Sequence, residues 1–477
     1  MELSTNESSM QIMDLGFHCL ENCLRHLTIE ELLNVADSNK EMRDTARYVF
    51  KRMHGRNLVH FIEVLKFRNG DDERTCECCR GRFFGRLRSS DKTIEIRQLK
   101  LGLQFLRCFG DLFSEIEFRF CFRQVQPSSS HCQSRQSELI QFHRAHEWEP
   151  LLIGYINEYC SESLTKIEFY GKDSKDYSSH DLIKLTKPFV KVEKLICDVF
   201  FLAKKKLHEL FPKLRELELR SVCFSEDMPP LDNEYIANCF PYLEHLTINL
   251  SDMNKCNRKN FAIALRLNPQ IKTLAGNIWF EVLFDADNFH FWNGNEDFQN
   301  LEKLQLKIRL HANPKLRDIL MKPVSEDLHF KNLKELNVDF GTDVYDDTVW
   351  TFLFFCDKLE SLTISSNCEL RQFSNLLNKH PTVKKLDIDN YADIMSSDDC
   401  LRISRAFPLL EEILFGVEPD DFVAAIEMFP SLKCFKYLEW KEKSCDVINR
   451  LRPLNGWSVS NTNAIYNTRL IEGKRHS

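Results

Sequence analysis

Thiol and imidazole side chains are the groups in this sequence whose spacing comes nearest to a metal site. They are Cys76, Cys78 and Cys79, followed along the chain by Cys108, Cys121, His131 and Cys132. Tetrahedral zinc sites usually take two ligand pairs, each spaced by two to four residues. Cys76 and Cys79 form one such pair, but no second Cys-x-x-Cys or His-x-x-x-His completes it. We therefore interpret the segment as a polar loop with incidental thiols and predict no bound metal.

Four arginines flank the same thiols, namely Arg74, Arg80, Arg82 and Arg86. Nearby positive charge favours the thiolate, which is the reactive and metal-binding form, so a metal- or redox-sensing loop stays an alternative. The sequence has no Gly-rich phosphate loop, no His-Glu-x-x-His and no Gly-x-Ser-x-Gly. We predict a protein that is not an enzyme, with no catalytic residues and no cofactor.

The composition is that of a globular protein, because 43% of the 477 residues are hydrophobic and 28% are charged. The formal charge of −7, with both signs spread along the chain, argues against nucleic acid, which usually demands a basic face. The polar segment from Met1 to Met10 lacks the pattern of a secretory signal, and no apolar run approaches the ~18 residues of a membrane span. We expect a cytoplasmic or nuclear protein, or both, with no membrane partner and with reduced cysteines.

One phrase recurs along the chain: an apolar residue, two variable residues and then an apolar-x-apolar alternation. The copy at Leu214 reads LRELEL, and the copy at Leu243 reads LEHLTI. The copies begin at Leu164, Val192, Leu214, Leu243, Ile271, Leu301, Leu333, Leu359, Val383, Leu410 and Leu432. Ten steps across 268 residues give a mean period of 26.8 residues. That period lies within the ~20 to 29 residues of leucine-rich repeats.

Each copy predicts a short strand with one apolar face. In the copy at Leu214, Leu217 and Leu219 share one face of the strand, and the glutamates between them share the other. Apolar residues at helical spacing predict returning helices at 233–239, 261–267, 349–355 and 373–377. Prolines fall where these helices end, at Pro212, Pro241, Pro269, Pro381, Pro408 and Pro430. Because no unit can bury its apolar face alone, we predict an α/β fold, an irregular leucine-rich-repeat solenoid of parallel strands and convex helices.

An earlier unit is expected before Leu164. It comprises a helix over Leu103–Phe109 that Gly110 closes and a strand over Ile116–Phe120. The segment 124–143, rich in Ser, Gln and Arg, predicts a surface loop between this unit and the next.

Residues 11 to 55 have a different apolar rhythm, which predicts two or three short helices. Thr28 is placed as an N-cap, and Glu31 three residues later completes a capping box. The phrase LGFHCL from Leu15, then LTIEELLNVA from Leu27 and Met42-Arg43, resembles an F-box. Gly16 and His18 stand where that family usually has proline and an acidic residue. A plain helical cap that shields the first repeat is the alternative reading of this module.

An F-box ahead of such repeats is similar to F-box/leucine-rich-repeat proteins, especially the divergent insect type. The resemblance implies a substrate-recognition subunit of an SCF-type (cullin-RING) ubiquitin ligase, whose N-terminal helices bind the ligase adaptor protein and thereby the cullin complex. The adaptor-binding residues that it implies are Leu15, Phe17, Leu20, Leu24, Leu27, Leu32 and Leu33. The alternative function is a leucine-rich-repeat scaffold or adaptor with no ligase role.

The exposed face of the strands is the expected site for an unknown protein substrate. Its residues include Glu216, Glu218, His245, Thr247, Lys303, Gln305, Glu335, Asn337, Lys385 and Asp387. Their mixed charge suits a protein better than a polyanion. We divide the chain into a flexible N-terminus (1–10), the F-box-like module (11–55), a connecting segment with the Cys-rich loop (56–90), the solenoid (91–440) and a C-terminal cap and tail (441–477).

Overall fold

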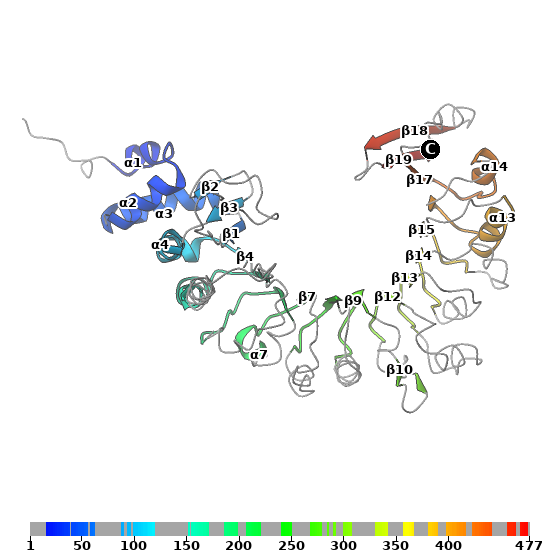
Figure 1. Cartoon of the computed structure of the whole chain (residues 1–477), viewed down its shortest axis with the longest axis horizontal. Helices are drawn as coiled ribbons and strands as arrows, with labels where there is room; N and C mark the ends of the chain where they lie inside the picture. Colours follow the sequence, from blue (N-terminus) through cyan, green and yellow to red (C-terminus); the bar gives the residue numbers. More distant parts are fainter. Residues whose placement is uncertain are drawn as a thin grey trace, which may run out of the picture. The chain divides into compact units, whose positions relative to one another are not determined.

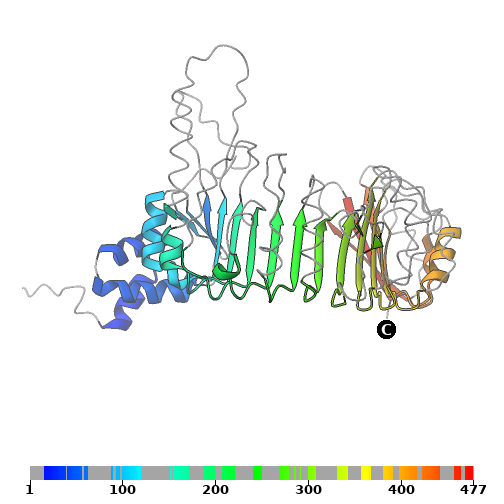
Figure 2. The same cartoon turned by 90° about the horizontal axis from the view of Figure 1, so that it is seen from below.

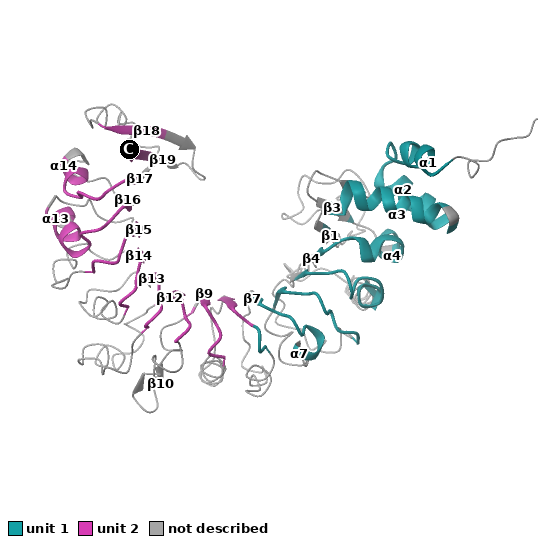
Figure 3. Cartoon of the chain, turned by 180° about the vertical axis from the view of Figure 1, so that it is seen from behind, with its two compact units in different colours: residues 1–225, 238–242 teal, residues 226–237, 243–477 magenta. Residues whose placement is uncertain are grey.

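The structure is a computed structural model. It describes residues 16–38, 40–55, 58–62, 87–89, 93–96, 99–119, 151–152, 154–170, 186–198, 207–220, 240–249, 268–278, 284–285, 290–291, 299–307, 330–341, 356–366, 380–389, 397–415, 422–440, 456–463 and 468–475. The segment 1–10, Leu15, the Cys76–Cys79 cluster, the loop 124–143 and the four predicted returning helices lie outside these residues. The chain forms two compact units, one of Met1–Ser225 with Asn238–Tyr242 and one of Glu226–Ala237 with Leu243–Ser477 (Figure 3).

Unit 1 begins with a helical module, drawn in blue in Figure 1. Its helices are α1 (Phe17–Leu24), α2 (Ile29–Ser38) and α3 (Lys40–His54), and α4 (Leu99–Phe109) packs against α2 and α3. Ala36, Ala46 and Phe50 are fully buried among them. The module therefore has an apolar core of its own, as its sequence rhythm predicts.

The sheet of unit 1 follows the module. Its strands, in spatial order, are β2 (Leu87–Ser89), β3 (Thr93–Ile96), β1 (Leu58–Ile62), β4 (Glu115–Arg119), β5 (Lys166–Tyr170), β6 (Lys194–Asp198) and β7 (Glu216–Arg220). All neighbours are parallel except β2 and β3. The short helix α7 (Leu207–Leu210) precedes β7.

The segment 56–90, which the sequence-based division treats as a connection, contributes β1 and β2 to this sheet. Val59 of β1 is fully buried opposite Ile94 and Ile116, so β1 extends the apolar row of the sheet. The parallel array therefore begins before residue 91. The sequence did not indicate this, because β1 lacks the recurring leucine phrase.

Gly110 lies where the sequence places the end of the helix, because α4 ends at Phe109. It begins a 3₁₀ turn, Gly110–Leu112. A Cβ at this position would lie 2.9 Å from both Cys160 Sγ and Tyr159 Cβ. Close packing against the next repeat therefore also requires glycine here.

Unit 2 contains eight parallel strands that stand side by side (Figure 2). They are β8 (His245–Asn249), β9 (Thr273–Asn277), β12 (Lys303–Lys307), β13 (Glu335–Gly341), β14 (Ser361–Ser366), β15 (Lys385–Asp389), β16 (Glu412–Phe415) and β17 (Cys434–Trp440). The helices α13 (Ser397–Ala406) and α14 (Phe422–Glu427) return the chain before β16 and β17. A two-stranded hairpin joins β10 (Phe284–Asp285) to β11 (His290–Phe291).

The recurring phrase is what builds the core of each unit. In unit 2, the second residue of each parallel strand is buried, and these residues lie side by side in one row. They are Leu246, Leu274, Leu304, Leu336, Leu362, Leu386, Ile413 and Phe435. The first apolar residue of each phrase, such as Leu301 or Leu333, is buried before its strand. The alternation predicted from the sequence is thereby confirmed, and the fold is α/β, of the leucine-rich-repeat type, preceded by helices.

In the repeats where the structure describes this position, a buried side chain precedes the turn into the strand. It is aromatic in Phe211, Phe330 and Phe407, whereas Cys356 and His380 take the same place in other repeats. The amide of the phrase's first apolar residue donates to the carbonyl of this residue, as from Leu214 to Phe211 at 3.2 Å. Proline follows as the second residue of a four-residue turn, where its fixed φ is favoured. The predicted position of the prolines, at the turn into the strand, is confirmed.

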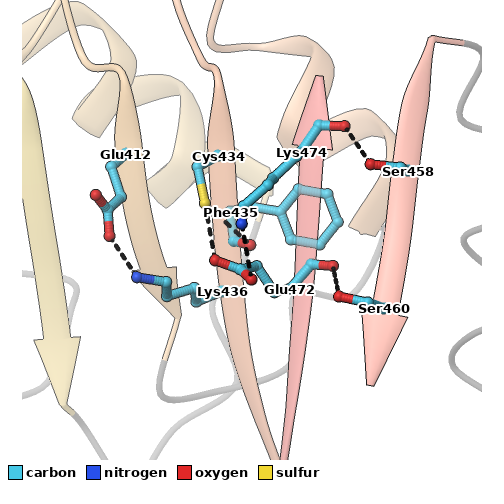
Figure 4. Close-up of polar contacts among 8 residues, drawn as sticks. All are labelled: Glu412, Cys434, Phe435, Lys436, Ser458, Ser460, Glu472 and Lys474. Carbon is cyan, nitrogen blue, oxygen red and sulfur yellow. Dashed lines mark hydrogen bonds and ion pairs between the residues drawn. The ribbon is translucent and has the colours of Figure 1, made fainter. Parts of the chain in front are cut away.

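Two antiparallel strands close unit 2, β18 (Trp457–Asn463) and β19 (Thr468–Arg475), with β19 between β17 and β18. Phe435 of β17 lies opposite Gly473, where a Cβ would overlap its ring. The Arg475 amide donates to Lys433 O at 2.9 Å, in the way each repeat's amide bonds the preceding repeat. The strand β19 thus takes the place of a next repeat (Figure 4).

Candidate interaction surfaces

The entry into α2 is fixed by a capping box. The Thr28 amide donates to Glu31 Oε2 at 2.7 Å, and the Glu31 amide donates to Thr28 Oγ1 at 3.3 Å. Hydrogen bonds from Thr28 hold the pKa of the Glu31 carboxyl below its usual value. The predicted capping box is confirmed.

Most of the predicted adaptor-binding residues within the described chain lie inside the module. Leu20, Leu24, Leu32 and Leu33 are all buried in the packing of α1, α2 and α3. Leu27 is half-buried between α1 and α2, and Phe17 is exposed. The four buried leucines therefore hold the helices together, and they are not available at the surface for a partner.

An exposed aromatic pair joins two of the helices. Phe17 of α1 is 47% exposed and Tyr48 of α3 is 45% exposed, and their rings meet edge to face with centroids 5.3 Å apart. Sequence reasoning missed Tyr48. Its signal was present, because Tyr48 departs from the apolar face that Met42, Ala46 and Val49 form on α3.

A buried carboxylate fixes α1 on α3. Glu21 of α1 is 5% exposed and pairs with Arg25, and with Arg52 of α3 at 2.6 Å. Burial raises the pKa of Glu21, but the two guanidinium groups outweigh it and hold the pKa below the usual value. The carboxylate is therefore charged and paired, which orients α1 and the Phe17 ring upon it.

The module is joined to the first repeat through α4. Arg47 of α3 binds both carboxylate oxygens of Asp111, at 2.6 and 2.8 Å, and also donates to the carbonyl of Cys108 at 2.5 Å. Phe50 stacks on Phe109 with centroids 4.3 Å apart and rings 4° from parallel. Ionic, hydrogen-bonded and aromatic contacts together fasten the helices to the strand array.

The exposed strand face of unit 1 carries Glu216 and Glu218, both half-buried on β7. Lys194 of β6 lies 2.8 Å from Glu216, so the first row of this face is partly neutralised. In the row that contains Glu218, Glu117 and Glu168 are opposite each other and only 5% and 6% exposed. Glu168 is paired with Lys166 of the same strand. Burial lowers the pKa of Lys166, but the hydrogen bond and the negative charge of Glu168 raise it more, so this pKa lies above its usual value.

The exposed strand face of unit 2 brings eight of the ten predicted substrate residues onto one surface. Lys303 is opposite Glu335 at 2.7 Å, and Lys385 lies 3.6 Å from Glu412. The next row on this face, formed by the third residues of β8 to β15, is polar and mainly uncharged: Thr247, Ala275, Gln305, Asn337, Thr363 and Asp387. Because the lysines and glutamates neutralise each other, this face would bind a partner mainly through hydrogen bonds and less through net charge.

At the end of the same face, Lys436 of β17 lies 2.7 Å from Glu412 (Figure 4). Burial raises the pKa of Glu412, but Lys436 and Lys385 outweigh it and keep the pKa below the usual value. Glu412 is thus a charged carboxylate shared by two lysines.

A second set of charges was not predicted. The residue after each phrase's first apolar position alternates in sign along unit 2: Glu244, Lys272, Glu302, Lys334, Glu360, Lys384, Glu411 and Lys433. The pairs Lys272–Glu244 and Lys334–Glu302 close at 3.1 and 2.9 Å, and Lys433–Glu411 closes at 2.9 Å. We call these eight residues the charge ladder. It was readable in the sequence, by comparing one position between repeats.

Thiols in the described part of the chain are mostly core residues. Cys108, Cys160, Cys197, Cys356 and Cys400 are buried thiols, and burial raises the pKa of Cys160 and Cys356 far above the usual value. Among the residues that the structure describes, no three His, Cys, Asp or Glu side chains gather as they would around a metal ion. Within the same ranges, no helix has the length and apolar character needed to cross a bilayer.

Comparison with known proteins returned no matching family model and no matching curated protein. Among solved structures, the Rad7 and Elc1 complex in yeast is similar at 14% identity and a TM-score of 0.38, covering 84% of this chain and 87% of that chain. The leucine-rich repeat-containing protein LegL7 from Legionella pneumophila is 12% identical, with 65% and 94% covered and a TM-score of 0.33. The TLR13–ssRNA13 complex is 13% identical, with 60% and 40% covered and a TM-score of 0.30.

Proposed function

We propose that this chain is the substrate-recognition subunit of an SCF-type ubiquitin ligase. Its N-terminal helices bind the ligase adaptor, and its exposed strand face binds the protein to be ubiquitinated. The observation that carries the proposal is the exposed Phe17–Tyr48 pair on a helical module whose other large apolar residues are mostly buried.

The aromatic pair is suited to an interface. Aromatic side chains are enriched among the few residues that supply most of the binding energy of protein complexes. Phe17 and Tyr48 each keep nearly half of their surface in water, which a partner would cover. Leu27 is the one other described residue of the implied adaptor set that is not fully buried. The docking surface of the proposal is therefore centred on Phe17 and Tyr48.

The helical module is joined to the repeats of unit 1 by direct contacts, as suits a receptor subunit. The Arg47–Asp111 and Phe50–Phe109 contacts attach α3 to α4, directly before β4. A flexible linker would leave the position of the target free, whereas this joint fixes the docking helices on the first strands of unit 1.

The target end is the strand face. Rows of Lys, Glu, Gln, Asn and Thr side chains lie in register across β12, β13, β14 and β15. Such a surface offers donors and acceptors at a regular spacing of about 4.8 Å between strands. It therefore supports recognition of a protein segment through hydrogen bonds.

A pull-down with purified ligase adaptor tests the docking end. We expect the intact chain to retain the adaptor, and Phe17→Asp or Tyr48→Asp to lose most of that binding, because each change places a charge at the centre of the surface. Met53→Asp is the matched control: Met53 is 44% exposed on the same helix, but about 140° around it from Tyr48. Absence of adaptor binding by the intact, folded chain would refute the ligase role.

The second candidate is a scaffold on the same repeats with no ligase role. The observation that favours it is the closed packing of Leu20, Leu24, Leu32 and Leu33, since a module that only caps the array needs no exposed contact. Identification of co-purifying proteins separates the two functions. A ligase receptor would bring down adaptor and cullin with its target, and a scaffold would bring down targets alone.

A further inference from the structure

Among the residues that the structure describes, the strand β18 lies at one edge of the sheet of unit 2. Within the described residues it pairs with β19 alone, in an unbroken antiparallel register from Trp457–Arg475 to Asn463–Arg469. In an antiparallel ladder the N–H and C=O groups of alternate residues point to opposite sides. About half of the backbone groups of β18 therefore point away from β19, toward any strand that would pair there.

The features that usually protect such an edge are missing from β18. Its seven residues, Trp-Ser-Val-Ser-Asn-Thr-Asn, include no proline, no lysine and no other charge, and its register with β19 contains no bulge. The edge strand of unit 1 is different, because β2 is only three residues long and carries Arg88. Unit 1 thus has a blunted edge, and unit 2 has a long neutral one.

We infer that β18 pairs with β18 of a second copy of this chain, antiparallel across a two-fold axis, and so joins two chains through unit 2. An axis through Ser460 would place Ser458 opposite the partner's Thr462, and Val459 opposite the partner's Asn461. Every residue that is brought opposite a partner in this register is uncharged, so no like charges meet. A strand that carries charges of only one sign would repel its copy in this arrangement.

Side chains at Trp457, Ser458 and Ser460 hold the first half of β18 in the geometry of a strand. Ser458 Oγ donates to Lys474 O at 3.2 Å and Ser460 Oγ to Glu472 O at 3.5 Å (Figure 4). Trp457 packs on Phe435 with ring centroids 5.2 Å apart, which ties the strand to the core of unit 2. Pairing therefore requires little ordering of β18, and this lowers its entropic cost.

The expected dimer is weak. One pair of seven-residue strands buries less than the ~1,200 to 2,000 Å² of a stable interface, so we expect a dissociation constant on the order of 100 µM. This dimer is independent of the proposed adaptor binding, because it uses unit 2 and not the helical module.

Sedimentation equilibrium of the full chain at about 10 to 300 µM tests the inference. We expect the mean mass to rise toward that of a dimer, and amide exchange within 457–463 to slow as the concentration rises. A chain that stays monomeric throughout this range would overturn the inference.

A charge-swap pair makes the test specific. Ser460 is exposed, so Ser460→Lys and Ser460→Glu should fold normally, which circular dichroism and the melting temperature check. Each variant alone places like charges opposite each other, and should raise the dissociation constant roughly fivefold or more. An equimolar mixture of the two should restore association to at least that of the unmodified chain. The matched control is Leu409→Lys, which adds the same charge at an exposed turn before β16.

Two results would place the contact elsewhere and so refute the inference. In the first, both Ser460 variants form a dimer with the same dissociation constant as the unmodified chain. The other is loss of association in Leu409→Lys.

Discussion

Arg47 of α3 holds Asp111 with one nitrogen that contacts both carboxylate oxygens, while its other terminal nitrogen reaches the carbonyl of Cys108. Cys108 lies in the last turn of α4 and Asp111 in the 3₁₀ turn after it, so a single side chain joins the N-terminal helices to the start of the repeats. Asp111 is about half exposed, which weakens the ionic part of this contact through solvent screening. The hydrogen bond to the Cys108 carbonyl is the better shielded part.

Replacing Arg47 should therefore loosen the module from the array. We expect Arg47→Met to lower the free energy of unfolding by about 1 to 3 kcal/mol, mainly by leaving a backbone acceptor without its donor. Urea unfolding measures the change, and proteolysis between the module and β4 should become faster. Lys51→Met, an exposed change on the same helix, should leave both unchanged.

The buried row of leucines should be the main determinant of the stability of unit 2. Leu304 is fully buried between Leu274 and Leu336, so Leu304→Ala should cost about 2 to 5 kcal/mol, from lost apolar burial and the cavity left behind. Leu409→Ala is the control, because Leu409 is 51% exposed, and it should change stability by less than about 0.5 kcal/mol. Equal effects of the two changes would contradict the packing described for β12.

Two glycines with positive φ allow a separation of backbone strain from steric overlap. Gly276 has φ of 106° and a Cβ there would overlap the backbone carbonyl of Ile248, whereas Gly456 has φ of 85° and open space around it. Gly456→Ala should cost about 1 to 2 kcal/mol from the left-handed conformation alone. Gly276→Ala should cost clearly more, as measured by thermal unfolding. If the two costs were equal, the close approach of β8 and β9 at Gly276 would not hold.

Acidification should weaken the core at His380. Burial lowers the pKa of this histidine below 6.5, so the unfolded chain takes up a proton at a higher pH than the folded chain. Its contribution is therefore complete above pH 6.5 and is lost as pH falls from 6.5 toward the lowered pKa. Phe is the natural replacement, since Phe330 and Phe407 occupy the same place in other repeats.

We expect His380→Phe to reduce the loss of stability between pH 7.5 and 5.5, measured by urea unfolding at both values. The pKa of His54 is also lowered by burial, and the variant keeps His54, so part of the pH dependence should remain. An unchanged pH dependence in His380→Phe would exclude this histidine as a cause.

The charge ladder should respond to salt. Lys334→Glu would place three glutamates in succession, at 302, 334 and 360. Hydrogen bonding and charge from Lys334 lower the pKa of Glu302, so the reversal removes a favourable contact and adds a repulsive one. The melting temperature should fall at low salt, and the difference from the unmodified chain should narrow in 1 M NaCl, because salt screens exposed charges. A difference that does not depend on salt would show that packing, not charge, was disturbed.

The sequence predicted those parts of the fold that one repeated constraint controls. Leu304 and Leu336 alternate with polar residues because one face of each strand is buried, and Pro241 marks a turn because it cannot donate a hydrogen bond. The Thr28–Glu31 box could be predicted for a similar reason, since both partners lie within one turn of helix. Local rules were sufficient at each of these positions.

Features that depend on contacts distant in sequence could not be predicted in this way. The reason for Gly110 is the close approach of Tyr159 and Cys160, about fifty residues later. The strand β1 belongs to the sheet through Ile94 and Ile116, with no repeat phrase of its own. The packing of three helices decides whether a leucine of the helical module faces a partner or the core of the module. The amphipathic pattern of a single helix is compatible with either orientation.

The alternating signs of the charge ladder also restrict how unit 2 can change in length. Loss or duplication of a single repeat would bring two glutamates or two lysines together at the junction, whereas loss or duplication of two adjacent repeats would keep the order of signs. The smallest segment that can be added or removed without a like-charge contact is therefore a pair of repeats. Any shortened or extended version of this array should be designed with an even number of them.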